Sequence, residues 1–85
     1  MNEDSKILYR FSSQSGGEII ETTLTRDGEG RLDLFCRFVN GEETETVLLP
    51  DLGRREERCL AFARTVAESH TRPRMLRELW EEYEA

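Results

Sequence analysis

The pattern of apolar and polar residues changes its period once along the chain, near Pro50. Before that residue, apolar side chains recur at alternate positions, as in strands with one buried face. After it they recur with helical spacing, as in amphipathic helices. This order predicts an α+β fold, ββββαα, in which a four-stranded antiparallel β-meander carries two C-terminal helices packed on one sheet face.

The first predicted strand, residues 6–12, follows a polar tail at residues 1–5. Alternation places Leu8 on the open face of the sheet. It places three residues on the buried face: Ile7, Tyr9 and Phe11. If Ser15-Gly16 forms a two-residue hairpin loop, Phe11 lies opposite Ile20 in the second strand, residues 18–26.

The next two turns contain the pairs Asp-Gly and Asn-Gly, which favour hairpins. A three-residue loop with a bulge within residues 27–30 would bring Leu24 opposite Leu32. A two-residue turn at Asn40-Gly41 would pair Leu34 of the third strand, residues 31–39, with Val47 of the fourth.

All three turns place one set of side chains on the same buried face. The set on the second and third strands is Ile20, Thr22, Leu24, Leu32, Leu34, Cys36 and Phe38. Because a slip of one residue would turn every side chain over, this agreement favours the meander.

The helix pair is expected between Leu52 and Tyr83, with Asp51 as the cap of the first helix. The break at Thr71-Arg72-Pro73 follows from the angles that a residue before proline avoids. The first apolar stripe is Cys59, Phe62, Ala63, Val66, Ala67 and His70. The second stripe is Met75, Leu76, Leu79, Trp80 and Tyr83.

The length of 85 residues predicts a single domain, 1–85, with the sheet at 6–50 and the helix pair at 52–84. A domain of this size buries only about 60% of its unfolded surface, so its stability is expected to be modest. An acidic start, no apolar run long enough to span a membrane, and two cysteines predict a cytoplasmic protein with reduced thiols.

The net charge of −6 disfavours direct nucleic-acid binding, because attraction to phosphates dominates that affinity. The charge is uneven along the chain. Residues 52–77 hold seven Arg against three Glu, whereas residues 78–85 hold four Glu and no basic residue.

No catalytic, metal or cofactor signature is present in the sequence. His70 and Cys59 lie about 16 Å apart along one predicted helix, too far for a nucleophile and its base. Two cysteines and one histidine, widely spaced, do not make a zinc site. We therefore expect a protein that is not an enzyme and needs no cofactor.

The open face of the sheet is the first candidate site, because it carries large apolar residues where a wet face is usually polar. The candidate interface residues are Leu8, Ile19, Phe35, Arg37, Val39 and Leu48. This face predicts a small interaction or regulatory domain with a protein partner, most simply a homodimer. The alternative is scattered exposure, with arginine stems lying over the apolar atoms.

A second candidate is an anion or phosphate-ligand site at Arg72, Arg74 and Arg77, beside the helix start at Pro73. The alternative is that these arginines pair with acids of the last helix, namely Glu78, Glu81 and Glu82. A further alternative function is an acidic inhibitor or nucleic-acid mimic, in which the carboxylates that imitate phosphates are Glu42, Glu43, Glu45 and the terminal Glu run.

Residues 32–84 resemble a family of small bacterial proteins of unknown function. The resemblance rests on Asn40-Gly41, an amphipathic helix, and a last helix that begins at Pro73, has Leu76 three residues on and ends in acids. The chain departs from that family at Leu32-Asp33-Leu34, where an aromatic-glycine-aliphatic triplet is usual, and at Met75, where a histidine is common. The resemblance implies a small uncharacterised domain and supplies no activity or site residues.

Overall fold

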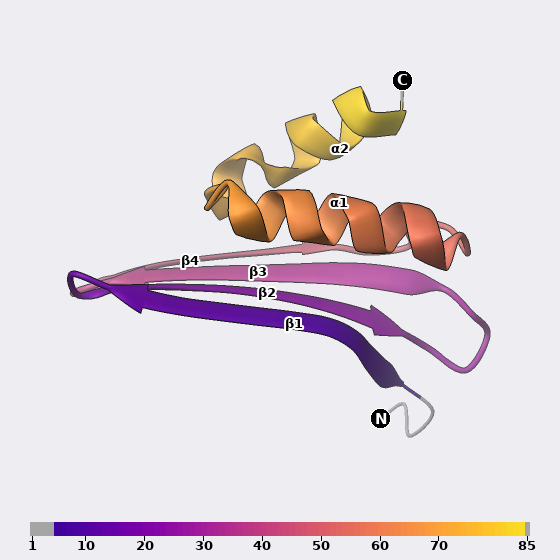
Figure 1. Cartoon of the computed structure of the whole chain (residues 1–85), viewed down its shortest axis with the longest axis horizontal. Helices are drawn as coiled ribbons and strands as arrows, with labels where there is room; N and C mark the ends of the chain where they lie inside the picture. The colour runs from indigo at the N-terminus through magenta and orange to yellow at the C-terminus, as the bar shows by residue number, and fades with distance from the viewer. Residues whose placement is uncertain (1–4, 85) are drawn as a thin grey trace.

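The computed structural model describes residues 5–84. The elements are β1 (Lys6–Ser15), β2 (Glu18–Arg26), β3 (Leu32–Asn40), β4 (Glu43–Leu49), α1 (Glu56–Glu68), the 3₁₀ helix η1 (Pro73–Met75) and α2 (Leu76–Glu84). The sheet order is β1-β2-β3-β4, with every neighbouring pair antiparallel, and both helices follow on one side of the sheet (Figure 1). The predicted α+β meander followed by two helices is confirmed.

The core lies between the sheet and α1, on the face that the alternation predicts. The most deeply buried strand residues are Leu24, Leu32, Leu34 and Thr22, each with no exposed surface. From α1 the core receives Cys59, Phe62, Ala63, Val66 and Ala67. The side-chain hydroxyl of Thr22 lies 3.7 Å from the thiol sulfur of Cys36, so this buried polar side chain has a partner.

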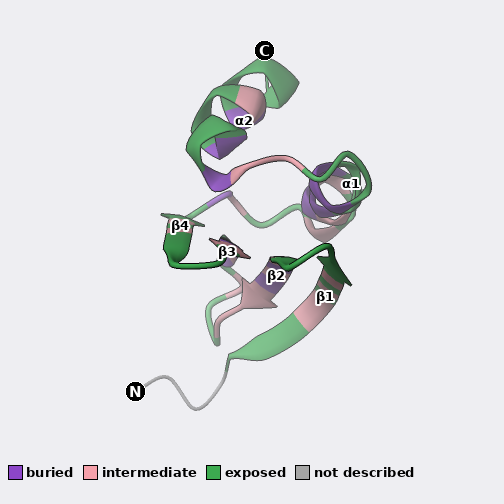
Figure 2. Cartoon of the chain, turned by 90° about the vertical axis from the view of Figure 1, so that its left-hand side faces the viewer, coloured by how far each residue is buried: buried purple, intermediate pink, exposed green. Residues whose placement is uncertain are grey.

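The two helices cover different parts of the sheet. α1 lies over β1 and β2, whereas η1 and the start of α2 lie over β3 and β4, and α2 then points away from the sheet (Figure 2). α2 joins the core through Leu76 and Trp80. The Trp80 ring packs edge-on against Phe62 of α1 at 4.9 Å between centroids, so aromatic contact holds the helices together.

The register of each hairpin differs from the predicted register by two residues. The first turn is Gly16-Gly17, which places Phe11 opposite Thr22, and the last is Gly41-Glu42, which places Cys36 opposite Val47. The middle loop spans residues 27–31. Because a shift of two residues keeps every side chain on the same face, the buried set was right although the pairings were wrong.

The alternation of buried and exposed side chains is interrupted near the start of β1. The register shifts between Ile7 and Tyr9, so Leu8 is the extra residue of a β-bulge. Leu8 consequently packs against the core, whereas Ile7 is 59% exposed. The prediction that Ile7 is buried and Leu8 lies on the open face is wrong for this reason.

The first helix begins later than predicted, because the chain first returns to the sheet. Leu52 donates its backbone N–H to Leu32 at 2.7 Å, and Leu32 donates to Gly53 at 3.1 Å. Asp51 has a left-handed backbone, with φ of 58°, and is not the helix cap. Arg55 occupies the N-cap position without a side-chain capping bond.

Three predicted members of the apolar stripes are exposed, namely His70, Met75 and Tyr83, of which Tyr83 is 37% exposed. His70 follows the end of α1, is exposed and has φ of 53°, so it has turned away from the helical stripe. Met75 lies in η1 and is 44% exposed. The predicted break at residues 71–73 is present, with Pro73 as the first residue of η1. No helix within residues 5–84 is long and apolar enough to cross a membrane.

Candidate functional sites

The open face of the sheet carries two apolar rows separated by a charged one. The strand register places Phe35 directly opposite Leu48, and Ile19 directly opposite Val39. These pairs come from residues that point away from the helices, since their neighbours on each strand are core residues. The apolar surface is therefore arranged by cross-strand pairing and not scattered.

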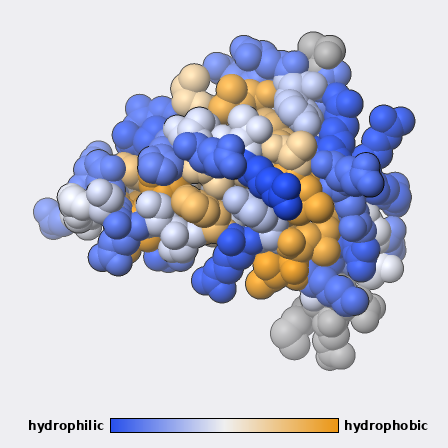
Figure 3. All heavy atoms as spheres, viewed as in Figure 1, coloured by the Kyte–Doolittle hydropathy of each residue, from blue (hydrophilic) through white to orange (hydrophobic). Residues whose placement is uncertain are grey.

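Three large side chains of this face are well exposed. Ile7 is 59%, Leu48 51% and Phe35 37% exposed, while Ile19 and Val39 are half-buried. Figure 3 shows hydrophobic residues reaching the surface beside the start of β1. Of the six predicted interface residues, all but Leu8 point out from this face, and Ile7 takes the place of Leu8 because of the bulge.

The charged row between the two apolar rows is formed by Glu21 of β2 and Arg37 of β3, which lie opposite each other. Arg37 Nε is 3.0 Å from Glu21 Oε1, yet this nitrogen has no aligned hydrogen-bond acceptor. This contact is thus an ion pair without an aligned hydrogen bond from Nε. Arg37 therefore keeps N–H groups that could donate hydrogen bonds to a further carboxylate.

The predicted anion site at the helix break is already in contact with a carboxylate of the chain itself. Glu45 of β4 accepts from Arg72 at 3.0 Å and from Arg74 at 2.5 Å. The hydrogen bond from Arg74, followed by that from Arg72, holds the pKa of Glu45 below its usual range, and Glu45 in turn raises the pKa of Arg74. For these two arginines the expected partners in the last helix are replaced by Glu45.

The third arginine of that predicted site does not join the other two on Glu45. Arg77 lies on α2, is exposed and takes part in none of the ion pairs within residues 5–84. The three arginines consequently do not converge on one free position. Glu45 is also committed to this contact, whereas Glu42 and Glu43 are exposed.

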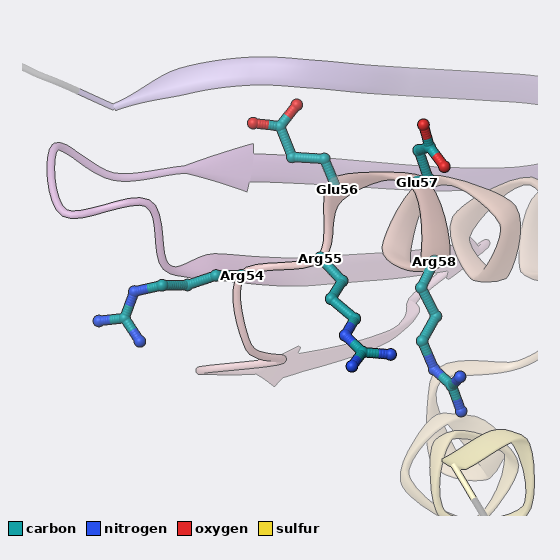
Figure 4. Close-up of a pocket in the computed structure, with 5 residues that line it drawn as sticks. All are labelled: Arg54, Arg55, Glu56, Glu57 and Arg58. Atoms are coloured by element: carbon teal, nitrogen blue, oxygen red, sulfur yellow. The ribbon is translucent and has the colours of Figure 1, made fainter.

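Sequence reasoning did not single out the start of α1, where a hollow of about 630 Å³ is lined by residues 54–58. Arg55 and Arg58 point to one side, toward the end of α2, whereas Glu56 and Glu57 point to the opposite side (Figure 4). Glu56 forms an ion pair with Arg26 of β2. The signal available in the sequence was the arginine excess of residues 52–77.

An adjoining hollow of about 420 Å³ extends this region to α2. Its apolar floor includes the buried residues Leu52 and Trp80, and its rim includes Arg55, Arg58 and Glu84. Arg58 is fixed at the rim, because its Nη2 donates to the Tyr83 carbonyl at 3.0 Å and its guanidinium lies over the Tyr83 ring at 5.2 Å.

The two thiols lie in the core. Burial raises the pKa of both Cys36 and Cys59, which keeps them protonated and weakly nucleophilic near neutral pH. Within the described part of the chain, no three His, Cys, Asp or Glu side chains are grouped so that they could hold a metal ion.

The chain matches no protein-family model, no curated protein and no solved structure. The resemblance of residues 32–84 to a family of small bacterial proteins therefore stays a prediction.

Proposed function

We propose that the protein is a small interaction domain that self-associates through the open face of its sheet. The observation that carries this proposal is the pairing of Phe35 with Leu48, two large apolar side chains exposed beside each other on adjacent strands. Surface of this kind costs free energy in water and is favourable to cover.

The charges of the same face support a second copy of the chain as the partner. Two copies can stack face to face about a two-fold axis parallel to the strands and midway between β2 and β3. Glu21 of one copy then faces Arg37 of the other, and the reverse contact forms by symmetry. Each Arg37 gains a second carboxylate, which compensates for loss of water around the ion pair. In the neighbouring row Phe35 faces Thr23 and Leu48 faces Arg10, so the methyl group of Thr23 and the stem of Arg10 cover the apolar pair.

The small area of the face favours a proposed dimer of low affinity. Four strands about 4.8 Å apart and about seven residues long cover roughly 450 Å². A standard interface takes roughly 800 Å² from each partner. We therefore expect a weak dimer with a dissociation constant in the micromolar range, roughly 1–100 μM.

Sedimentation velocity over a range of protein concentrations tests the proposal. The wild-type chain should pass from monomer to dimer, and Phe35→Glu should remain a monomer, because the apolar contact is lost and a carboxylate would have to lose its water on association. Met75→Glu is the matched control, since Met75 is exposed to a similar degree but lies in η1, on the helix side of the sheet.

Circular dichroism of each variant separates loss of the dimer from loss of the fold. A wild-type chain that stays monomeric at high micromolar concentration would overturn the proposal. So would a dimer that survives both Phe35→Glu and Leu48→Glu.

A further inference from the structure

Three arginines lie close together at the start of α1, namely Arg54, Arg55 and Arg58, and no carboxylate within residues 5–84 forms an ion pair with them. The other arginines without an ion pair lie apart from one another along the chain. Carboxylates do pair with Arg26, Arg31, Arg37, Arg72 and Arg74. Arg54 and Arg58 instead donate to neutral backbone carbonyls, of Glu29 at 3.3 Å and of Tyr83 at 3.0 Å. These contacts position the two guanidinium groups without an ion pair. The pKa of Asp27 is lowered by the backbone N–H of Arg31 and, to a smaller degree, by the charge of nearby Arg54. The freer charge is therefore that of Arg55 and Arg58.

The hollow beside these arginines joins charge to apolar surface. Its floor contains Trp80, which is 9% exposed, and Leu52, which is 8% exposed. Arg55 and Arg58 point together toward the end of α2, which borders the hollow (Figure 4). A volume of about 420 Å³ lies within the range of small-ligand sites.

The acids near this hollow do not cancel its charge. Glu56 is held by Arg26, and Glu57 points to the opposite side of the helix start. Glu84 borders the hollow against Arg55 and Arg58, whereas the guanidinium of Arg54, which also lines the hollow, points away from these two toward Glu29 (Figure 4). Because Glu56 and Glu57 already complement the positive end of α1, the attraction for an anion comes from the guanidinium groups.

We propose that this hollow binds a phosphate monoester that carries an aromatic group, with Arg55 and Arg58 on the phosphate and the ring against Trp80. Guanidinium groups recognise phosphate through paired N–H donors, and a doubly charged oxyanion uses more than one of them. The aromatic group follows from the indole and leucine floor, which an inorganic ion would leave uncovered. The site is independent of the sheet face that forms the proposed dimer.

Phenyl phosphate is the probe. Trp80 is the single tryptophan of the chain, so its fluorescence reports binding at this hollow, and calorimetry gives the affinity. Phenyl phosphate should bind about tenfold more tightly than inorganic phosphate, because its ring covers apolar surface. Adenosine monophosphate and phosphotyrosine, tested next, distinguish the two common sources of this chemistry.

The variant Arg55→Ala should weaken binding of phenyl phosphate about tenfold, through loss of charge-assisted hydrogen bonds. Arg55 has no structural hydrogen bond from its side chain within residues 5–84, so the fold should persist. Arg64→Ala is the matched control. Arg64 is an exposed arginine further along α1 that does not line the hollow.

Several results would overturn the proposal. One is the absence of any fluorescence change or heat at ~10 mM phenyl phosphate, a concentration that would nearly saturate a site with a dissociation constant of about 1 mM. Another is an equal loss in Arg64→Ala, which would reduce the effect to general charge attraction. If inorganic phosphate bound as tightly as phenyl phosphate, the proposed recognition of an aromatic group would be wrong. If phenylacetate bound as tightly as phenyl phosphate, the proposed recognition of phosphate would be wrong.

Discussion

The guanidinium carbon of Arg72 lies 3.9 Å from the centre of the Phe38 ring. Arg72 also donates to Glu45, so one side chain from the helix break contacts both β3 and β4. Its backbone is extended, with φ of −71° and ψ of 146°, which is the conformation favoured before proline. The Arg72 side chain thereby holds the break between the helices against the sheet. The following proline favours the backbone conformation from which this side chain reaches the sheet.

Replacement of Arg72 tests this fastening. We expect Arg72→Ala to lower the free energy of unfolding by about 1–2 kcal/mol, because stacking on Phe38 and the contact with Glu45 are both lost. Arg77→Ala, an exposed arginine that shares neither contact, should change it by less than about 0.5 kcal/mol. Urea unfolding monitored by circular dichroism gives both values, and equal losses would contradict the role of Arg72.

Stability should fall in acid, partly through Glu45. The pKa of Glu45 is lowered from an ordinary 4.5, so below that pH the unfolded chain takes up the proton before the folded chain does. The stabilisation from Glu45 is therefore full above pH 4.5 and is lost as the pH falls through its folded-state pKa. Asp27, whose pKa is lowered by the backbone N–H of Arg31, contributes in the same direction.

Urea unfolding between neutral pH and about pH 3 measures this dependence. In Glu45→Gln the loss of stability on acidification should be smaller than in the wild-type chain. Glu42→Gln, an exposed residue of the last turn, serves as the control and should keep the wild-type slope. A wild-type slope in Glu45→Gln would contradict the assignment.

The loop between β2 and β3 offers a matched pair of glycines. Gly30 has φ of 87°, and a Cβ there would lie 3.9 Å from the nearest atom of Arg54, an ordinary contact. Gly30→Ala should therefore cost about 1–2 kcal/mol from backbone strain alone. The φ of Gly28 lies outside the left-handed region, so Gly28→Ala should be neutral or stabilising by less than about 1 kcal/mol. Thermal unfolding of both variants measures these two changes in stability, and equal losses would contradict the prediction.

The faces of the sheet could be predicted from the sequence, whereas the registers could not. Alternation sets which side chains share a face, and Leu24, Leu34 and Phe38 are buried as it predicts. Strand twist and loop geometry decide which residues form the tip of each turn. A register shift of two residues leaves every side chain on its face, so the alternation does not reveal it. Gly16-Gly17 and Gly41-Glu42 therefore form the turns in place of the predicted pairs.

The bulge at Leu8 had no signal in the local pattern, because Ile7 and Leu8 are both apolar and either could face the core. The partner of Arg72 and Arg74 was also beyond sequence reasoning, since Glu45 lies 27 residues before Arg72 and reaches it only through the fold. The sequence suggested instead that these arginines would pair with nearby acids of the last helix. The open-face residues Phe35, Val39 and Leu48 needed only strand parity, and they were placed correctly.

The order β1-β2-β3-β4 has a kinetic consequence. Each strand pairs with the strand before it in the chain, so the sheet can form one hairpin at a time with short loops to close. Such local topology is associated with fast folding for a protein that contains a sheet. The contact of Glu45 with the arginines around Pro73 joins residues far apart in the sequence, and we expect it to form after the hairpins.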